Sequence, residues 1–282
     1  MTAIDYLLLG HITADLTPDG RKLGGTVSYA APIANSFNHR VGVVTSAAAC
    51  EPLLANLDEN IRLSVRASKA TTTFENIYPP NASRVQYIHA LASPIEYDDV
   101  PVGWVNAPLV HLAPLVAEIA PEIVNKFADA SVMVTPQGWL RKWDAEGKVS
   151  FKRWFDADVL SKVDIIVFSK HDVLAAPEME YEFAGAVKHC LVTDGANGGI
   201  YYLDGVPTNF PPHLVEEVDP TGAGDVFASS LLSSLPLLDH NMHAAIRVAA
   251  RLAAISVTHP GVYTFSPQEV EQAIRDARQE FL

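Results

Sequence analysis

One segment near residue 220 combines the residue types that phosphate chemistry needs. Two glycines, an alanine and an acid lie where a loop turns into an apolar helix, in the run Val218-Asp219-Pro220-Thr221-Gly222-Ala223-Gly224-Asp225-Val226-Phe227-Ala228. Glycine lets the backbone approach a ligand, and the first N–H groups of a helix lack internal acceptors, so this junction can bind an anion. A carboxylate beside that anion, Asp225, can take the proton of an attacking hydroxyl. The segment therefore predicts phosphoryl transfer, in which positioning and charge stabilisation supply most of the catalysis.

A plainer interpretation of the same segment stays open. Thr221 or Asp219 can cap the helix while the glycines serve only a tight turn. Two other phosphate-binding motifs do not fit. A Walker A loop needs a Gly-Lys-Ser or Gly-Lys-Thr sequence, which does not follow here, and a dinucleotide fingerprint opens the first strand-helix unit of a fold rather than a late helix.

Short apolar runs predict the sheet that positions this segment. They are Ile4–Leu9, Val41–Thr45, Leu109–Leu112, Val132–Thr135, Ile165–Phe168 and Cys190–Thr193. Continuous runs of this kind mark strands that are buried on both faces. Helix-like stretches lie between or after them, at Glu118–Phe127, Glu178–Lys188, Gly222–Leu235, His240–Thr258 and Pro267–Leu282. The alternation predicts an α/β fold of three layers, with a central, mostly parallel sheet flanked by helices.

Residues 62–95 break this alternation. Three strand-like stretches follow one another there, Arg62–Ala67, Thr71–Ile77 and Arg84–His89, with Pro79-Pro80-Asn81 as a turn. We expect a small β-sheet that projects as a lid, drawn mainly from residues 12–24 and 62–95. Its strands offer Glu75, Asn76 and Arg84 as candidate substrate contacts, and an open lid edge predicts a homodimer through the lid. No linker or repeat is present, so residues 1–282 are expected to form a single domain.

Composition narrows the function classes. The chain has 282 residues, 49% of them hydrophobic, with 16 Gly, 19 Pro and 2 Cys, which excludes disordered, collagen-like and disulfide-scaffold chains. The formal net charge of −13 argues against a nucleic-acid partner, because phosphate backbones are bound by clusters of Lys and Arg. The first residues reach Asp15 after a short apolar stretch with no basic residue, so we expect neither a signal peptide nor a membrane span. Cys50 and Cys190 lack C-x-x-C spacing and favour free thiols in a cytoplasmic protein.

The motifs resemble those of one known family. Asp-Pro-Thr-Gly-Ala-Gly-Asp-Val-Phe is similar to the C-terminal signature of the ribokinase-like (PfkB) carbohydrate kinases. Gly24-Gly25 before a helix resembles the family's N-terminal di-glycine motif, and Asp15 its substrate-binding acid. The run Val192-Thr193-Asp194-Gly195-Ala196-Asn197-Gly198-Gly199 resembles the turn on the nucleotide side. These pieces occur in the family's order over nearly the whole chain.

The resemblance implies roles for individual residues. Asp225 would be the catalytic base, and Gly222, Ala223 and Gly224 would form the anion hole. Asp15, Gly24, Gly25, Tyr29, Arg84 and Gln137 would bind the acceptor, while Thr193, Gly195, Asn197, Gly198, Thr221 and Lys170 would bind the nucleotide, with adenine near residues 250–257. The implied reaction is Mg²⁺-dependent transfer of the γ-phosphoryl group of ATP to an alcohol. A K⁺ site near Asp219 and Thr221 is a further feature that the resemblance allows.

Two stretches depart from the family pattern. Where the family has Asn-x-x-Glu, this chain has Ser169-Lys170-His171-Asp172, so Asp172 takes the place of the carboxylate that organises Mg²⁺ through water. Tyr29 stands where sugar kinases often have an asparagine, and a phenol offers one O–H where an amide offers two donors and an acceptor. The di-glycine region is closer to the divergent branch that includes myo-inositol kinases.

The sequence therefore favours an ATP-dependent small-molecule kinase that acts on a sugar, inositol or nucleoside hydroxyl. The alternative is a catalytically silent protein of the same fold that senses a nucleotide or polyol, since fold and function are separable. Gln137 and Arg141 follow a buried strand, where open α/β sheets bind ligands, and His11 is the histidine to test for substrate contact.

Overall fold

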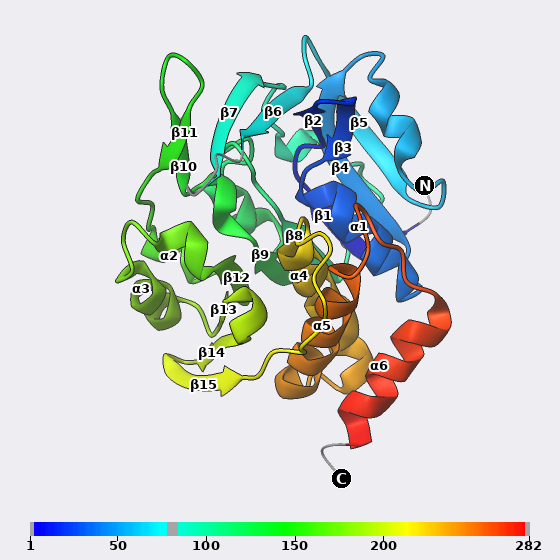
Figure 1. The fold of residues 1–282 in the computed structure, drawn as a ribbon, viewed down its shortest axis with the longest axis vertical. Coiled ribbons are helices and arrows are strands. Elements are labelled where there is room, and N and C mark those ends of the chain that lie inside the picture. Colours follow the sequence, from blue (N-terminus) through cyan, green and yellow to red (C-terminus); the bar gives the residue numbers. More distant parts are fainter. Residues whose placement is uncertain (1–2, 78–83, 280–282) are drawn as a thin grey trace.

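The computed structural model describes residues 3–77 and 84–279, so the expected turn at residues 79–81 lies outside the described residues. The main sheet has nine strands in the order β15-β14-β13-β12-β9-β8-β1-β4-β5 (Figure 1). Their bounds are β1 (Tyr6–Leu9), β4 (Val41–Ala48), β5 (Arg62–Ser68), β8 (Leu109–Leu112), β9 (Ser131–Val134), β12 (Ile165–Ser169), β13 (His189–Thr193), β14 (Gly199–Leu203) and β15 (Val206–Phe210). The strands from β13 to β5 are parallel, whereas β14 and β15 form an antiparallel edge. The expected mostly parallel sheet is confirmed.

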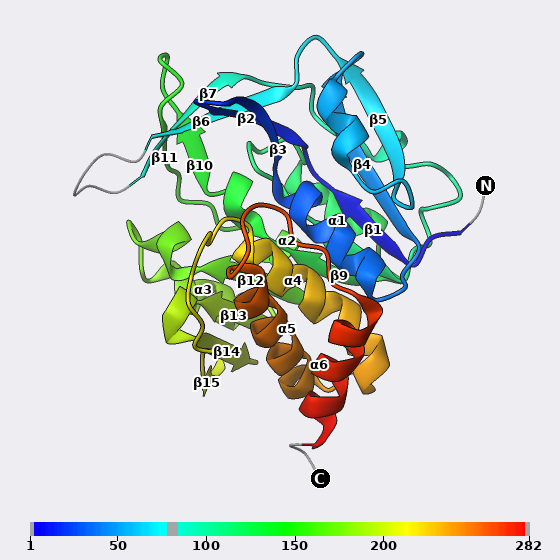
Figure 2. The same ribbon diagram turned by 45° about the vertical axis from the view of Figure 1, so that its right-hand side comes forward.

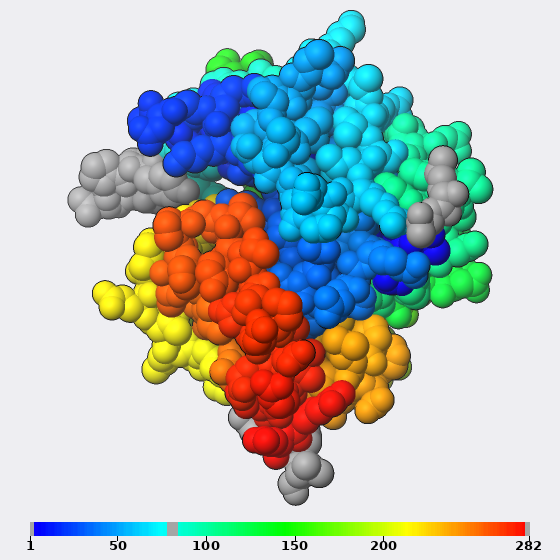
Figure 3. Space-filling model, turned by 90° about the vertical axis from the view of Figure 1, so that its right-hand side faces the viewer, coloured from blue at the N-terminus to red at the C-terminus, as the bar shows by residue number. Residues whose placement is uncertain are grey.

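Helices cover both faces of this sheet. One face packs against α1 (Thr26–Ser36), α4 (Ala223–Ser234), α5 (Met242–Ser256) and α6 (Pro267–Gln279), and Figure 3 shows α6, in red, on the outside of the molecule. The other face packs against α2 (Ala157–Leu160), α3 (Met179–Ala186) and the short helix η3 (Pro121–Lys126). Successive strand residues point to opposite faces, so Val167 belongs to the first core and Phe168 to the second.

The lid is a second sheet beyond the carboxyl ends of the main strands (Figure 2). Its order is β3-β2-β6-β7, with bounds β2 (Thr13–Thr17), β3 (Gly20–Gly24), β6 (Thr72–Ile77) and β7 (Val85–Ala90). A hairpin of β10 (Arg141–Trp143) and β11 (Val149–Phe151) reaches the lid, where the Ile88 N–H donates to Gly147 O (2.8 Å). The hairpin thereby covers the β7 edge.

Two expected elements differ in the structure. Arg62–Ala67 is part of β5, which extends the main sheet beside β4 instead of the lid. An edge strand alternates polar and apolar residues as a lid strand does, so the sequence pattern does not separate the two. Glu118–Phe127 is helical only over Pro121–Lys126, because the residue before a proline is driven to extended backbone, as Ala120 is at φ −64°, ψ 131°.

Short helices complete the connections. They are η1 (Pro52–Asn56), η2 (Tyr97–Asp99), η4 (Pro136–Gly138), η5 (Lys170–Val173), η6 (Gly195–Asn197) and η7 (Leu235–Leu238). Cys190 is buried and Cys50 is exposed, and both are free thiols. No helix in the described part of the chain has the length and apolar character needed to cross a membrane.

Candidate active site

A cavity of about 590 Å³ lies between the lid and the carboxyl ends of the main strands. Residues at or just beyond the ends of three parallel strands line it, namely Thr135, Ser169 and Thr193. Most of the predicted site residues line the same cavity. They are Asp15, Gly25, Tyr29, Arg84, Gln137, Asp172, Thr193, Thr221, Gly222, Ala223, Gly224 and Asp225.

Helix α4 points its N-terminus into this cavity. Gly222 precedes the helix in a left-handed conformation (φ 81°, ψ −2°), and no described side chain caps the first turn. The carboxylate of Asp219 is used elsewhere, because it accepts the N–H groups of Thr221 and Gly261 (both 3.0 Å). The plainer interpretation, in which a side chain caps the helix, is therefore wrong. An uncapped helix N-terminus that faces a cavity is suited to an anion.

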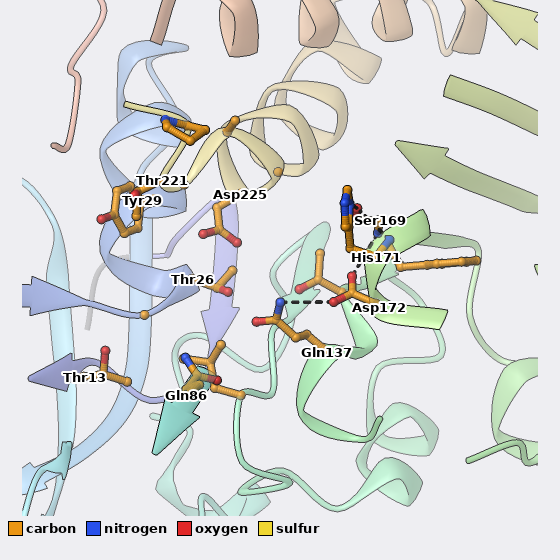
Figure 4. A pocket seen from close by; sticks show the side chains of 18 of the residues that line it. Thr13, Thr26, Tyr29, Gln86, Gln137, Ser169, His171, Asp172, Thr221 and Asp225 are labelled. Carbon is orange, nitrogen blue, oxygen red and sulfur yellow. Dashed lines mark hydrogen bonds between the residues drawn. The ribbon is translucent and has the colours of Figure 1, made fainter. Parts of the chain in front are cut away.

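Asp225 lies in the first turn of α4 and points into the cavity (Figure 4). The pKa of its carboxyl group is raised to about 6, mainly by burial and also by the charge of Asp172. A hydrogen bond with Thr26 and the charge of Arg141 act in the opposite direction. A carboxylate with a pKa near neutrality is well matched to a proton transfer from a hydroxyl group.

Tyr29 lines the cavity beside the N-terminus of helix α4. The side chain is 9% exposed, and its ring lies against Gly222 so closely that a Cβ at that glycine would be 2.2 Å from Tyr29 Cδ1. Figure 4 shows the ring beside Thr221 and Asp225. The phenol thus supports the N-terminus of α4 from helix α1.

Asp15 lies on β2 at the lid side of the cavity. Thr13 Oγ1 donates to its Oδ1 (2.8 Å), and burial raises the pKa of Asp15 while this bond and the charge of Arg84 lower it. Gly24 does not line the cavity. A Cβ at Gly24 would lie 2.5 Å from Asp15 Oδ2, so this glycine makes room for the carboxylate on the neighbouring strand.

The stretch Ser169–Asp172 forms a self-capped turn at the end of β12. The Ser169 side chain accepts the His171 N–H (3.2 Å), and Asp172 Oδ2 accepts the Ser169 N–H (2.9 Å). Gln137 Nε2 donates to Asp172 Oδ1 (3.3 Å), as Figure 4 shows. Gln137 therefore orients Asp172 as well as lining the cavity.

Four residues assigned to the nucleotide lie outside the cavity. Gly195, Asn197 and Gly198 form or follow the short helix η6, and Lys170 makes an ion pair with Asp194 (3.0 Å). The structure does not bring them together with Asp225, because the turn lies beyond the end of β13, where only Thr193 reaches the cavity. Their predicted contacts with a nucleotide stay predictions.

Burial and hydrogen bonding place three other candidate residues. His11 is fully buried, and its ring nitrogens contact Thr72 Oγ1 (2.8 Å) and Ser93 O (2.9 Å), so it ties lid segments together and does not line the cavity. Glu75 pairs with His89 outside the cavity. Asn76 does line it and accepts a hydrogen bond from Gln86 (2.9 Å).

Several cavity residues carry no recognisable sequence signal. Thr13, Thr26, Gln86 and Thr135 are single polar residues without motif spacing. Thr26 follows the di-glycine motif directly, and this position is the one hint that sequence offers. Arg141, which we expected near the crevice, also lines the cavity.

Comparison with known proteins identifies relatives of this architecture. Residues 156–269 match the model of the pfkB family carbohydrate kinases. An inositol 3-kinase from Zea mays is 29% identical over 169 residues, which is 58% of this chain and 43% of the maize protein. A cytidine kinase from Thermococcus kodakarensis is 24% identical over 257 residues, covering 82% of this chain and 88% of that protein.

A solved structure resembles nearly the whole chain. A pyrophosphate-dependent kinase of the ribokinase family, complexed with a pyrophosphate analog and myo-inositol, has a TM-score of 0.80 at 19% identity and covers 95% of this chain and 99% of that chain. At this identity the likeness shows the fold. This chain thus has the ribokinase fold, with a match to the pfkB family of carbohydrate kinases over residues 156–269 that contains the signature at residues 219–227.

Proposed function

We propose that this protein is an ATP-dependent kinase that phosphorylates a hydroxyl group of a small polyol, with residues 1–282 acting as one kinase domain. The observation that carries the proposal is the placement of Asp225. Its carboxylate shares one cavity with the uncapped N-terminus of α4 and with Asp15. A base, an anion site and an acceptor-binding acid are the groups that phosphoryl transfer to an alcohol needs.

The proposed reaction follows from these positions. Asp15 accepts a hydrogen bond from the acceptor and orients it, and Asp225 takes the proton of the attacking hydroxyl. The hydroxyl oxygen forms a bond to the γ-phosphorus, the bond from that phosphorus to the bridging oxygen breaks, and the electron pair leaves with ADP. The N–H groups at the start of α4 hold the charge on the transferred group.

The donor set of the cavity fits Mg²⁺. Asp172 and Asp225 supply carboxylates, and Mg²⁺ is usually held by one or two carboxylates together with phosphates and waters. Within the described residues no cluster of three His, Cys, Asp or Glu side chains is placed to hold a metal ion. When bound, Mg²⁺ would neutralise phosphate charge, and Asp172 would hold it through water.

Inositol is the acceptor that we propose. The maize relative is named an inositol 3-kinase, and the structural neighbour described above is complexed with myo-inositol. In this chain Tyr29 replaces the asparagine that is common in sugar kinases, and Asp15, Asn76, Gln86 and Arg84 offer polar groups from the lid side. A ring with hydroxyls on every carbon suits such a polar wall.

ATP is the donor that we propose, and pyrophosphate is its competitor. The loop before α4 exposes the apolar side chains of Leu214, Val215 and Val218, a surface that suits a purine base. The loop contacts the end of α5 through a hydrogen bond from the Val218 N–H to Val257 O (2.8 Å). The neighbouring structure uses pyrophosphate, so the donor needs a direct test.

The test of this function is a coupled assay of product release with purified protein. Mg·ATP or Mg·pyrophosphate would be supplied with inositols, pentoses, hexoses and nucleosides, each with and without KCl. We expect turnover of myo-inositol with ATP. Turnover of ribose or fructose alone would overturn the inositol proposal, and binding of ATP without turnover of any acceptor would favour a sensor.

The pH dependence of this reaction should report Asp225. Burial and Asp172 raise the pKa of Asp225 to about 6, against the opposing effects of Thr26 and Arg141. Because the base must be ionised to accept a proton, we expect kcat/KM to fall about tenfold per pH unit below this value. A Thr26→Val variant loses a hydrogen bond that lowers the pKa, so the acid limb should move to higher pH. If the acid limb instead reflects ionisation of the nucleotide, it should lie at the same pH in wild type and in Thr26→Val.

We also propose a homodimer through the lid. The hairpin β10–β11 covers the β7 edge, whereas no described strand pairs with the outer edge of β3. Open edges of this kind pair with other chains. Sedimentation at micromolar concentration should give the mass of a dimer, and a monomer mass would contradict this proposal.

The two free thiols agree with the cytoplasmic location that we propose.

A further inference from the structure

Arg141 is a charged residue of the cavity to which neither the family signature nor the comparisons assign a role. Its side chain is half-buried, and its Nη1 donates a long hydrogen bond to Leu115 O (3.5 Å). It makes no ion pair within residues 3–77 and 84–279. Placing a cation away from water without a paired anion is costly, so such a group is suited to an anionic ligand.

The charges around Arg141 identify where that ligand would lie. Asp172, Arg84, Asp225 and Glu118 are the charged groups that act on the guanidinium, and burial lowers its pKa to about 10, which leaves it protonated at neutral pH. Asp172 and Asp225 line the same cavity as the N-terminus of α4. Arg141 therefore supplies positive charge at the place where the base, the Mg²⁺-linked acid and the anion hole converge.

The backbone around Arg141 is held firmly. Trp139 is 2% exposed, and its Nε1 donates to Ile119 O (2.8 Å), while the Gly138 N–H donates to Pro114 O (2.8 Å). Trp139 thus belongs to the core. The buried carboxylate of Glu118 accepts the N–H groups of Leu115 (2.9 Å) and Val116 (2.8 Å) and fixes the segment that carries Leu115 O.

We propose that Arg141 is a catalytic residue that binds the transferred phosphoryl group, opposite the N–H groups of α4. The inference rests on the proposed kinase function. During transfer, the negative oxygens of the phosphoryl group lie between the guanidinium and the helix N-terminus, while the attacking hydroxyl gives its proton to Asp225 and the bridging oxygen leaves with ADP. A guanidinium suits this task because its planar donors match phosphate oxygens.

The experiment compares Arg141→Gln and Arg141→Lys with wild type, using Mg·ATP and the acceptor that wild type phosphorylates. Removal of a preorganised donor to developing charge typically costs about 10²–10³-fold in kcat, and we expect this loss in Arg141→Gln with KM for the acceptor nearly unchanged. Arg141→Lys should keep part of the activity, because it keeps the charge but not the planar donors. Arg153→Gln is the matched control, since Arg153 pairs with Glu182 at the surface, outside the cavity, and should behave as wild type.

Two further measurements separate catalysis from structure. Millimolar guanidinium ion should restore part of the turnover of an Arg141→Ala variant, whereas a structural defect would not respond. Mg·ADP with aluminium fluoride, which imitates the transferred group, should inhibit wild type more strongly than Arg141→Gln, while Mg·ADP alone should bind both equally.

Each other outcome overturns the inference in a distinct way. A raised KM for the acceptor with unchanged kcat would assign Arg141 to recognition of an anionic acceptor. Lost activity without guanidinium rescue and with equal aluminium fluoride inhibition would make Arg141 structural. Wild-type turnover that Arg141→Gln matches would remove this inference alone, whereas absence of turnover by wild type with every acceptor would remove the kinase function as well.

Discussion

Replacing Asp225 by asparagine should leave the fold intact and reduce phosphoryl transfer by about 10³-fold or more, the upper part of the range for loss of a general base. Asparagine has the shape of aspartate but cannot accept the proton of the attacking hydroxyl. The measurement is kcat with Mg·ATP and the acceptor that wild type uses. Asp158→Asn is the matched control, because Asp158 also lies in the first turn of a helix but is exposed and outside the cavity.

The same substitution should stabilise the folded protein at neutral pH. Burial and Asp172 raise the pKa of Asp225 from 3.8 to about 6, which means that the folded state disfavours the ionised carboxylate. The cost is absent at pH values below the unfolded pKa and is complete above the folded pKa. We therefore expect the Tm of Asp225→Asn to exceed that of wild type at pH 7.5 and the difference to shrink toward pH 4. Near-normal turnover of Asp225→Asn would contradict the assignment of the base.

The fold was predictable where a continuous apolar run in the sequence corresponds to a strand that is buried on both faces. Ile165–Phe168 and Cys190–Thr193 are continuous apolar runs, and both are interior strands of the main sheet with a paired strand on each side. β5 was misassigned because its polar alternation is shared by any strand with one wet face. The pairing partner of such a strand depends on residues distant in sequence, here those of β4. The sequence of Arg62–Ala67 alone therefore does not predict which sheet this strand joins.

The candidate site was predictable where one short segment contains several of its groups. Gly222 to Asp225 are adjacent in sequence, so helix geometry alone places the proposed base beside the proposed anion site. Thr26 meets Asp225 across almost two hundred residues, and a single threonine has no spacing that could announce this contact. Gly195 and Gly198 have a pattern that fits a phosphate turn, but they lie outside the cavity, so their nucleotide contacts stay a prediction.

Gly222→Ala should damage both stability and activity, because two effects act at one atom. A residue with a side chain held at φ 81° is strained by about 1–3 kcal/mol. The added Cβ would also lie 2.2 Å from Tyr29 Cδ1, so the ring or the first turn of α4 must move. Displacement of a catalytic group by about 1 Å can cost roughly 10²-fold in rate, and we expect a loss of that size in kcat together with a lower Tm.

The contribution of the Tyr29 contact can be separated from the backbone strain. Gly185→Ala in α3 is the matched control, since a Cβ there meets no atom within 4 Å, and a helical glycine to alanine change should raise stability slightly. In a Tyr29→Ala background the clash with the ring is removed, but the strain of a side chain at the positive φ of residue 222 remains. Gly222→Ala should therefore cost less stability there than in wild type. Equal costs in both backgrounds would show that Tyr29 does not support the N-terminus of α4. An unchanged Tm and kcat in Gly222→Ala alone would contradict the close packing that places the anion hole against this ring.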